Sequence, residues 1–261
     1  MVGKKSHQLS FALRQGKFNN ASSLIQSWDN YNPSNASIGK TSLISFIEEV
    51  QLKNNALTSA KIALDNARAE RKTLCFFNSK SNNSFCLEIH LMQIANYTAS
   101  CFGINSVEHK RIHDMLKKIK PNLVKGRHKR MKRGFKRTNP AKSILNKKVK
   151  EKLERSFIAM AGFAQSTAEF ISELIENGFN WNPPDENLSH TAIKNISEKL
   201  QELNSIIPVL NDNYKIAISE RKEIYKSMNE RIGMIKSYLA SFDGGKKYEH
   251  FIEFSQAIKG T

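Results

Sequence analysis

Apolar residues recur every seven positions along two stretches of the chain. A stripe sustained over four heptads places one narrow apolar face along a long helix, which is typical of a helix that packs lengthwise on a partner. We therefore predict two long helices with antiparallel neighbours. The apolar positions are Leu43, Phe46, Val50, Leu57, Ala60, Leu64, Ala67 and Leu74 in the first stretch, and Ile193, Ile196, Leu200, Leu203, Ile207, Leu210, Tyr214, Ala217 and Ile224 in the second.

An Asn-Pro pair precedes each stretch. Proline disfavours helical geometry in the residue before it, so Asn32-Pro33 and Asn182-Pro183 are each expected to separate an upstream helix from the long one. The composition of residues 77–84 is that of a loop, so the first long helix should break there, whereas the second is free to continue to Phe242. Each half is thus expected to begin with a helical hairpin.

Proline and glycine mark further expected features of the helices. Pro208 lies within the second stretch and removes one backbone donor, so we expect a kink or an interruption. Gly103 and Gly244 should each close a further helix, and a short final helix follows. No segment alternates apolar and polar residues for long enough to predict a strand. The predicted fold class is all-α, with two copies of a long antiparallel helical hairpin or coiled-coil-like bundle joined by a basic linker.

The two halves of the chain also repeat each other. Residues 22–74 align with 172–224 without a gap, and 14 of these 53 positions are identical, including Glu70-Arg71-Lys72 with Glu220-Arg221-Lys222. After nine extra residues in the first half, the match resumes at a shift of 141. There Ile94, Tyr97, Ala99, Ser100, Gly103, Glu108 and His109 recur as Ile235, Tyr238, Ala240, Ser241, Gly244, Glu249 and His250. Such a period indicates one structural unit present twice.

We therefore predict a first helical module over residues 1–120, a basic linker bracketed by proline and glycine over 121–140, and a second module over 141–261. In the 261 residues, 39% are hydrophobic and 25% charged, as in a soluble globular protein. No apolar run approaches the roughly 18 residues that a membrane span requires. The N-terminus is basic without a following apolar segment, so we expect no signal peptide and a cytoplasmic location.

Three motifs suggest chemistry, and none predicts a site. Gly39-Lys40-Thr41 ends like a phosphate-binding loop, but the motif requires glycine where Ser34 stands. Thr41 is expected near a helix start, where a hydroxyl can cap an amide. His109 and His113 are spaced to share a helix face, yet the second copy has Phe254 for His113. The cysteines, Cys75, Cys86 and Cys101, match no common zinc pattern. We predict no catalytic, cofactor-binding or metal-binding residue, and no enzyme.

Arg71 and Arg221 are the repeated positions with two open interpretations. Both fall on the seven-residue pattern, so each side chain should point toward a helix interface, where it needs a carboxylate or carbonyl partner. A structural role that fixes the register between helices is one interpretation. An anion-binding site formed by the two arginines is the other.

Nearly all of the net charge of +17 lies between the two copies. Residues 117–152 hold 16 Lys or Arg against one acid, Glu151, while the rest of the chain holds 25 basic and 23 acidic residues. Such a segment attracts a polyanion through phosphate contacts that release counterions. The predicted contacts to RNA or DNA are Lys125, Arg127, Lys129, Arg130, Lys132, Arg133, Lys136 and Arg137. The alternative is a helical scaffold, self-assembling or bound to a helical partner, in which the segment is only a linker.

The motifs Ala67-Arg68-Ala69-Glu70-Arg71 and Phe102-Gly103, followed by the basic segment, carry a resemblance. They resemble a group of small, uncharacterised bacterial basic helical proteins over residues 33–137, and again over 183–245 without the basic end. This chain differs in being duplicated and richer in Asn and Ile. The resemblance implies a helical fold and no known activity.

Overall fold

The computed structural model describes residues 2–75, 86–123 and 140–259, which contain helices and no strand. The predicted all-α class is therefore confirmed. Contacts between Cα atoms divide the chain into two compact units. Unit 1 comprises Met1–Ala63 and Asn211–Thr261, and unit 2 comprises Leu64–Leu210.

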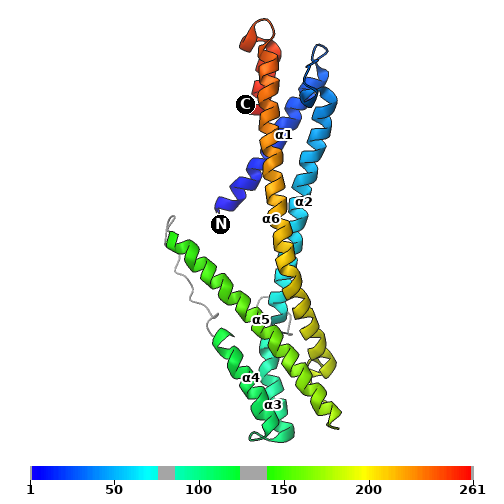
Figure 1. Cartoon of the computed structure of the whole chain (residues 1–261), viewed down its shortest axis with the longest axis vertical. Coiled ribbons are helices and arrows are strands. Elements are labelled where there is room, and N and C mark those ends of the chain that lie inside the picture. Colours follow the sequence, from blue (N-terminus) through cyan, green and yellow to red (C-terminus); the bar gives the residue numbers. More distant parts are fainter. Residues whose placement is uncertain (1, 76–85, 124–139, 260–261) are drawn as a thin grey trace. The chain divides into compact units, whose positions relative to one another are not determined.

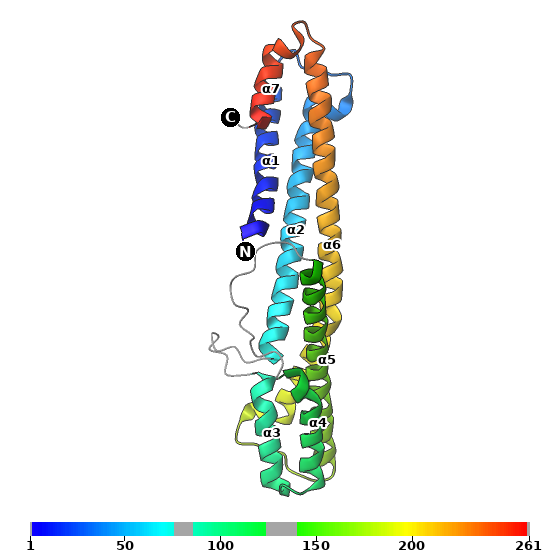
Figure 2. The same ribbon diagram turned by 90° about the vertical axis from the view of Figure 1, so that its left-hand side faces the viewer.

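Unit 1 brings together the two ends of the chain. It contains α1 (Val2–Ser27), the 3₁₀ turn η1 (Ala36–Ile38) and the first part of α2 (Lys40–Cys75). It also contains the last part of α6 (His190–Ala240), the turn η4 (Gly245–Lys247) and α7 (Glu249–Lys259). Figure 2 shows α1 beside α2 and α7. Buried side chains from all four helices form its core, among them Phe18, Leu43, Tyr225 and Phe254.

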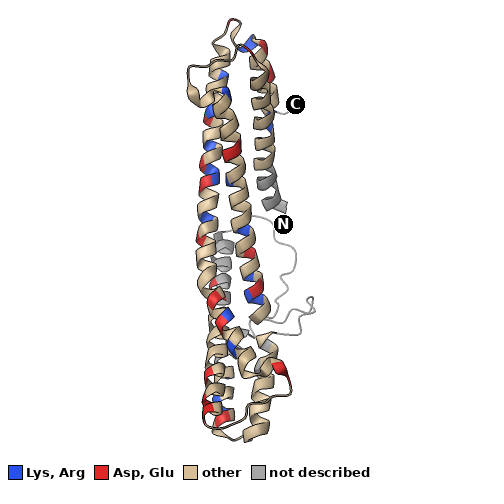
Figure 3. Cartoon of the chain, turned by 90° about the vertical axis from the view of Figure 1, so that its right-hand side faces the viewer, with Lys and Arg blue, Asp and Glu red and all other residues tan. Residues whose placement is uncertain are grey.

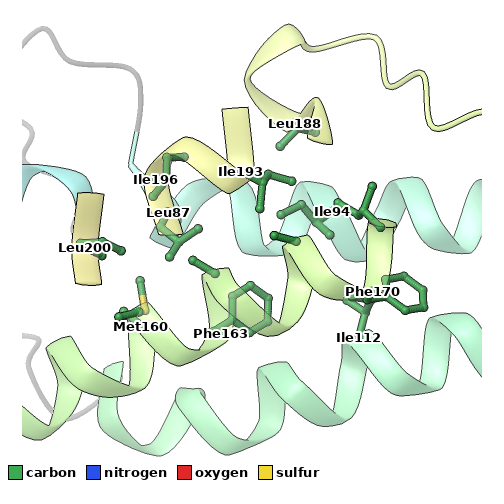
Figure 4. Close-up of a cluster of buried hydrophobic side chains, with 14 of the residues drawn as sticks. Leu87, Ile94, Ile112, Met160, Phe163, Phe170, Leu188, Ile193, Ile196 and Leu200 are labelled. Atoms are coloured by element: carbon green, nitrogen blue, oxygen red, sulfur yellow. The ribbon is translucent and has the colours of Figure 1, made fainter. Parts of the chain in front are cut away.

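Unit 2 is continuous in sequence. It contains the end of α2, then α3 (Leu87–Phe102), α4 (Val107–Leu123), α5 (Pro140–Glu176), the turn η3 (Glu186–Leu188) and the first part of α6. In Figure 1, α3 and α4 lie beside α5. Its core is drawn in Figure 4 and includes Leu87, Ile94, Ile112, Met160, Phe163, Phe170, Ile193 and Leu200.

The seven-residue stripes lie on the buried faces of α2 and α6. In α2, Leu43, Val50, Leu57 and Leu64 are each 3% exposed or less. Of the remaining predicted positions, Ala60, Leu74, Leu210 and Tyr214 are half-buried, and all the others are buried. Within each unit, α2 and α6 contact each other in antiparallel directions: the ion pair Lys53–Glu220 lies in unit 1 and Lys199–Glu70 lies in unit 2.

The helices end near the predicted Asn-Pro loops and near Gly103. Between α1 and α2, the side chain of Asn35 accepts a hydrogen bond from Ser37 N at 3.0 Å, and Asp185 accepts one from Asn187 N at the same distance between α5 and α6. An acceptor beside a free helical amide stabilises the start of a turn. Gly103 closes α3 with a φ of 91°, a backbone angle that glycine adopts without strain.

The predicted break in the first copy is also present, because α2 ends at Cys75 and α3 begins at Leu87. In the second copy, α6 continues over the corresponding region to Ala240. Thr41 and its repeat equivalent Thr191 lie near the starts of the long helices, as expected, but after the first helical residue. Helix α2 begins at Lys40 and α6 begins at His190. At the start of α6 the hydroxyl of Ser189 accepts a hydrogen bond from the backbone amide of Ala192 at 3.2 Å.

Of the two outcomes expected at Pro208, a kink or an interruption, the interruption is absent. Helix α6 is a single element of 51 residues with Pro208 inside it. A proline in a helix interior costs about 3 kcal/mol, because one hydrogen bond is lost and the ring presses on the preceding turn. Burial of Leu203 and Ile207, which both lie just before the proline, is worth about 1.5 to 3 kcal/mol for each side chain and offsets that cost.

Both compact units combine parts of the two sequence copies. Unit 1 takes its first 63 residues from copy one and residues 211–261 from copy two. The modules 1–120 and 141–261 describe the repeat along the sequence and stay a prediction. Most of the predicted linker 121–140 lies outside the described residues.

Candidate functional site

The eight predicted nucleic-acid contacts lie in residues 124–139, outside the described part of the chain. They are Lys125, Arg127, Lys129, Arg130, Lys132, Arg133, Lys136 and Arg137. In the helices that the structure does describe, Lys and Arg alternate with Asp and Glu along the surface (Figure 3). The charge asymmetry seen in the sequence is therefore centred on this segment and its flanks.

Arg71 is a buried cation in unit 2 with hydrogen-bond partners on two other helices. Its side chain is 4% exposed, and its Nη2 atom donates to Glu154 Oε1 at 2.8 Å. Nη1 donates to Asn204 Oδ1 at 2.9 Å, and the guanidinium lies 4.1 Å from the centre of the Phe157 ring. This set of contacts agrees with the structural interpretation, in which the arginine joins α2 to α5 and α6.

Arg221 occupies the matching repeat position, but its surroundings in unit 1 differ. Its guanidinium lies 4.4 Å from the centre of the Phe11 ring, and burial lowers the pKa of Arg221 from its ordinary value. Arg14 approaches the same ring at 5.9 Å and donates to Asn229 Oδ1 at 2.7 Å. Arg71 and Arg221 belong to different units, each with its own aromatic neighbour. The anion-site interpretation of the pair therefore gains no support.

Lys40, the lysine of the motif that resembles a phosphate-binding loop, holds two backbone oxygens. Its Nζ atom donates to Trp28 O at 2.6 Å and to Gln26 O at 3.1 Å. These carbonyls belong to the end of α1 and the residue after it, where helical hydrogen bonding leaves acceptors unused. The ammonium group closes the turn between α1 and α2, so the motif has a structural role.

The two histidines with candidate metal-binding spacing lie near the start of α4. The rings of His109 and His113 lie 6.0 Å apart, and His109 Nδ1 is 3.2 Å from Ala95 O. The backbone amide of His109 donates to Ser106 Oγ at 3.0 Å, so this residue belongs to the first turn of α4. Among the described residues, no group of three or more His, Cys, Asp or Glu side chains is placed to hold a metal ion.

One arrangement that the sequence did not reveal is a Cys, His and Asp trio in unit 2. His90 Nδ1 lies 2.8 Å from Cys86 O, and His90 Nε2 lies 3.7 Å from Asp185 Oδ2. The two ring nitrogens thus lie near a backbone oxygen and a carboxylate oxygen. Nearby, burial raises the pKa of the Cys75 thiol to about 12, which disfavours the reactive thiolate. The trio is a structural contact between α3 and the turn before η3.

Two hollows lie on unit 1. One of about 560 Å³ lies beside the loop after α1 and is lined by Pro33, Asn35, Ile38, Met234 and Tyr238, among others. A second of about 420 Å³ is lined by Phe46, Glu49, Lys53, Glu220, Glu223 and Arg231, among others. In the second hollow Lys53 pairs with Glu220, and Arg231 donates to Ser42 Oγ at 3.1 Å. Both cations of the second hollow are thus engaged by groups of the chain itself.

No family model, curated protein or solved structure matches this chain. The resemblance to small basic helical proteins accordingly stays a prediction. Within the described ranges, none of the helices combines the length and apolar character needed to cross a membrane.

Proposed function

We propose that this chain is a non-enzymatic nucleic-acid-binding protein that contacts the phosphates of RNA or DNA through its central basic segment. The observation that carries the proposal is the concentration of 16 Lys and Arg against one acid in residues 117–152, between the two copies of a helical repeat. The proposed contacts are Lys125, Arg127, Lys129, Arg130, Lys132, Arg133, Lys136 and Arg137.

Phosphate contact supports this function on simple electrostatic grounds. Each neutralised phosphate releases condensed counterions, so a protein with about 6 to 10 such contacts loses roughly 10³ to 10⁵ in affinity between 50 and 200 mM salt. Contacts of this kind carry no base information. The proposed binding is therefore strong at low salt and independent of sequence.

The rest of the chain supports the proposal by contrast. Outside residues 117–152 the basic and acidic residues nearly balance, at 25 and 23. Their alternation along the described helices in Figure 3 leaves the basic segment as the principal attraction for a polyanion. The role proposed for the two helical copies is to hold the segment between them.

A filter-binding experiment with two charge-matched variants tests the proposal. In the first, the eight proposed contacts are replaced by Gln. In the second, eight exposed lysines of the described helices are replaced by Gln, which lowers the net charge equally. These are Lys61, Lys72, Lys110, Lys194, Lys222, Lys226, Lys246 and Lys247. Each protein is titrated against mixed-sequence RNA and duplex DNA at 50 and 200 mM salt, after circular dichroism has shown that its helix content is unchanged.

We expect the parent and the helix-surface variant to bind at 50 mM salt with a steep salt dependence, and the segment variant to lose binding. Equal binding by the segment variant and the parent at 50 mM salt overturns the proposal. Equal losses in both variants also overturn it, because binding then follows total charge and not the segment.

The alternative function, a scaffold that packs its stripes on a further helix, has less support in the structure. The stripes of α2 and α6 are covered by helices of this same chain in the described residues. A self-assembling scaffold predicts a mass that rises with concentration in sedimentation equilibrium. A constant mass of 29.7 kDa would remove that form of the alternative.

A further inference from the structure

The same helix contact occurs once in each unit, and each time it joins different copies of the sequence repeat. At a shift of 150 residues α1 corresponds to α5, and at a shift of 141 α4 corresponds to α7. In unit 1, α1 packs on α7, and in unit 2, α5 packs on α4. The upstream helix of each copy thus contacts the final helix of the other.

Two equivalent hydrogen bonds, one in each unit, also join one copy of the repeat to the other. The backbone amide of Asn32 donates to the hydroxyl of Tyr238 at 3.1 Å in unit 1. The amide of Asn182 donates to the hydroxyl of Tyr97 at 3.2 Å in unit 2. Asn32 and Asn182 are equivalent in the repeat, as are Tyr97 and Tyr238. Both bonds therefore join the Asn-Pro loop of one copy to the tyrosine of the other.

The aromatic rings around these bonds are matched as well. Tyr31 packs edge-on against Tyr238, with ring centres 5.2 Å apart and planes at 84°. Its repeat equivalent, Trp181, packs edge-on against Tyr97 at 4.8 Å and 86°. Within their own copies, Tyr31 Oη and Trp181 Nε1 each donate at 2.8 Å to the backbone oxygen of the residue seven positions later. Edge-on aromatic pairs are worth about 0.5 to 1.5 kcal/mol beyond burial.

The length of α6 explains why the second copy cannot complete this contact by itself. An unbroken helix of 51 residues is about 75 Å long, at about 1.5 Å for each residue. Tyr238 lies near its end, and the loop of its own copy, which contains Asn182, precedes its start. A rigid helix does not fold back on itself, so Tyr238 must meet the loop of another copy.

We infer that the chain is a fused dimer, in which the hairpin that opens each copy is completed by the closing part of the other. The two joining surfaces are equivalent, as in a two-fold symmetric homodimer, where residue i contacts j and j contacts i. Fusion into one chain makes the second association intramolecular and raises its effective concentration. This inference concerns the construction of the helical units and stands apart from the proposed nucleic-acid binding.

Two ion pairs report on the exchange in the intact protein. Lys53 Nζ lies 3.2 Å from Glu220 Oε2 in unit 1, and Lys199 Nζ lies 3.6 Å from Glu70 Oε1 in unit 2. Each pair joins copy one to copy two, and the glutamates of the two pairs, Glu220 and Glu70, are repeat equivalents. A carbodiimide activates the carboxylate, the neighbouring amine attacks it, and an amide forms with loss of the activator as a urea. Only groups already in contact are joined.

The test treats an equal mixture of unlabelled and ¹⁵N-labelled full-length protein with a carbodiimide and identifies cross-linked peptides by mass spectrometry. We expect cross-links between Lys53 and Glu220 and between Lys199 and Glu70. In each cross-link both peptides should carry the same nitrogen isotope, because both come from one chain. The pair Lys215–Asp212, 2.6 Å apart within α6, is the positive control. Lys53→Arg and Lys199→Arg keep the charge and remove the primary amine, so each should abolish its own cross-link.

Absence of both cross-copy peptides, while the Lys215–Asp212 peptide forms, overturns the fused dimer and indicates that each copy closes on itself. Peptides that combine the two isotopes overturn it in another way, because the exchange then takes place between separate chains.

Discussion

The guanidinium of Arg71 in α2 and the carboxylate of Glu154 in α5 form an ion pair of 2.8 Å with one buried end and one solvated end. The Arg71 side chain is 4% exposed, whereas that of Glu154 is 51% exposed. Water therefore hydrates the carboxylate and scarcely reaches the cation.

Removal of the carboxylate should destabilise the protein more than removal of the cation. Glu154→Gln leaves a buried guanidinium without its counter-charge, and we expect a loss of about 1 to 3 kcal/mol in the free energy of unfolding. Arg71→Met fills the same space with an apolar side chain and leaves Glu154 in water, so it should cost less. Urea denaturation measures both.

Glu70→Gln is the control for this comparison, because its pair with Lys199 is exposed at both ends. An exposed pair contributes at most about 1 kcal/mol, and often nothing measurable. A larger loss for Arg71→Met than for Glu154→Gln would contradict the assignment of the buried end.

The three cysteines should react with thiol reagents at different rates. Cys75 and Cys86 are buried and Cys101 is exposed. With 5,5′-dithiobis(2-nitrobenzoate) at neutral pH, we expect one thiol of the folded chain to react quickly and all three to react in denaturant. Cys101→Ser should remove the fast phase, and its persistence in that variant would show that a buried thiol is accessible.

Alkaline pH should lower the free energy of unfolding, because the Cys75 thiol ionises more readily in the unfolded chain. Burial raises the pKa of this thiol from 9.0 to about 12 in the folded state. Between these values the unfolded chain releases the proton and the folded chain keeps it, so stability is unaffected below about pH 9 and falls as the pH rises toward 12. We expect a loss of about 1 kcal/mol between pH 8 and pH 10.

The measurement is urea denaturation at both pH values for the parent and Cys75→Ala. Burial also raises the pKa of Tyr31 above its ordinary value, so part of the loss should remain in the variant. An identical loss in the two proteins would mean that Cys75 ionises equally in the folded and unfolded states.

The repeat supplies a matched pair of proline substitutions. Pro208→Ala restores a backbone donor within α6, which stabilises the helix, but it also makes the unfolded chain less rigid, which opposes folding. We expect a net gain of about 1 kcal/mol in the free energy of unfolding. Thr58→Pro places proline at the equivalent position of α2 and should cost about 3 kcal/mol. Thermal unfolding of both variants checks the signs. A loss on Pro208→Ala would show that α6 depends on the proline.

The sequence predicted which faces are buried but not which helices cover them. The stripe from Leu43 to Leu64 defines an apolar face, and burial confirms it. A seven-residue period is equally satisfied by any helix of complementary shape, so nothing in it distinguishes a partner within the copy from one in the other copy. The contact of Tyr238 with Asn32 joins residues 206 positions apart, and such pairing is encoded in side-chain fit.

The chemical predictions met a similar limit. Position on the stripe correctly indicated that Arg71 faces inward, but Glu154 as its partner could not be read from spacing, because it belongs to another helix. His90 and Asp185 gave no signal for the same reason. The eight proposed phosphate contacts follow from charge density alone, a property of composition that holds without any knowledge of the surrounding fold.

The division of unit 1 between both ends of the chain has a consequence for synthesis on the ribosome. Unit 2 is continuous, so all of its residues have emerged once Leu210 leaves the exit tunnel. The first 63 residues cannot complete their core until residues 211–261 have been made. During that interval the apolar faces of α1 and early α2 lack their final cover, which is the state in which chaperones bind nascent chains and aggregation begins. Residues 1–63 are made before unit 2, yet they reach their native environment after it.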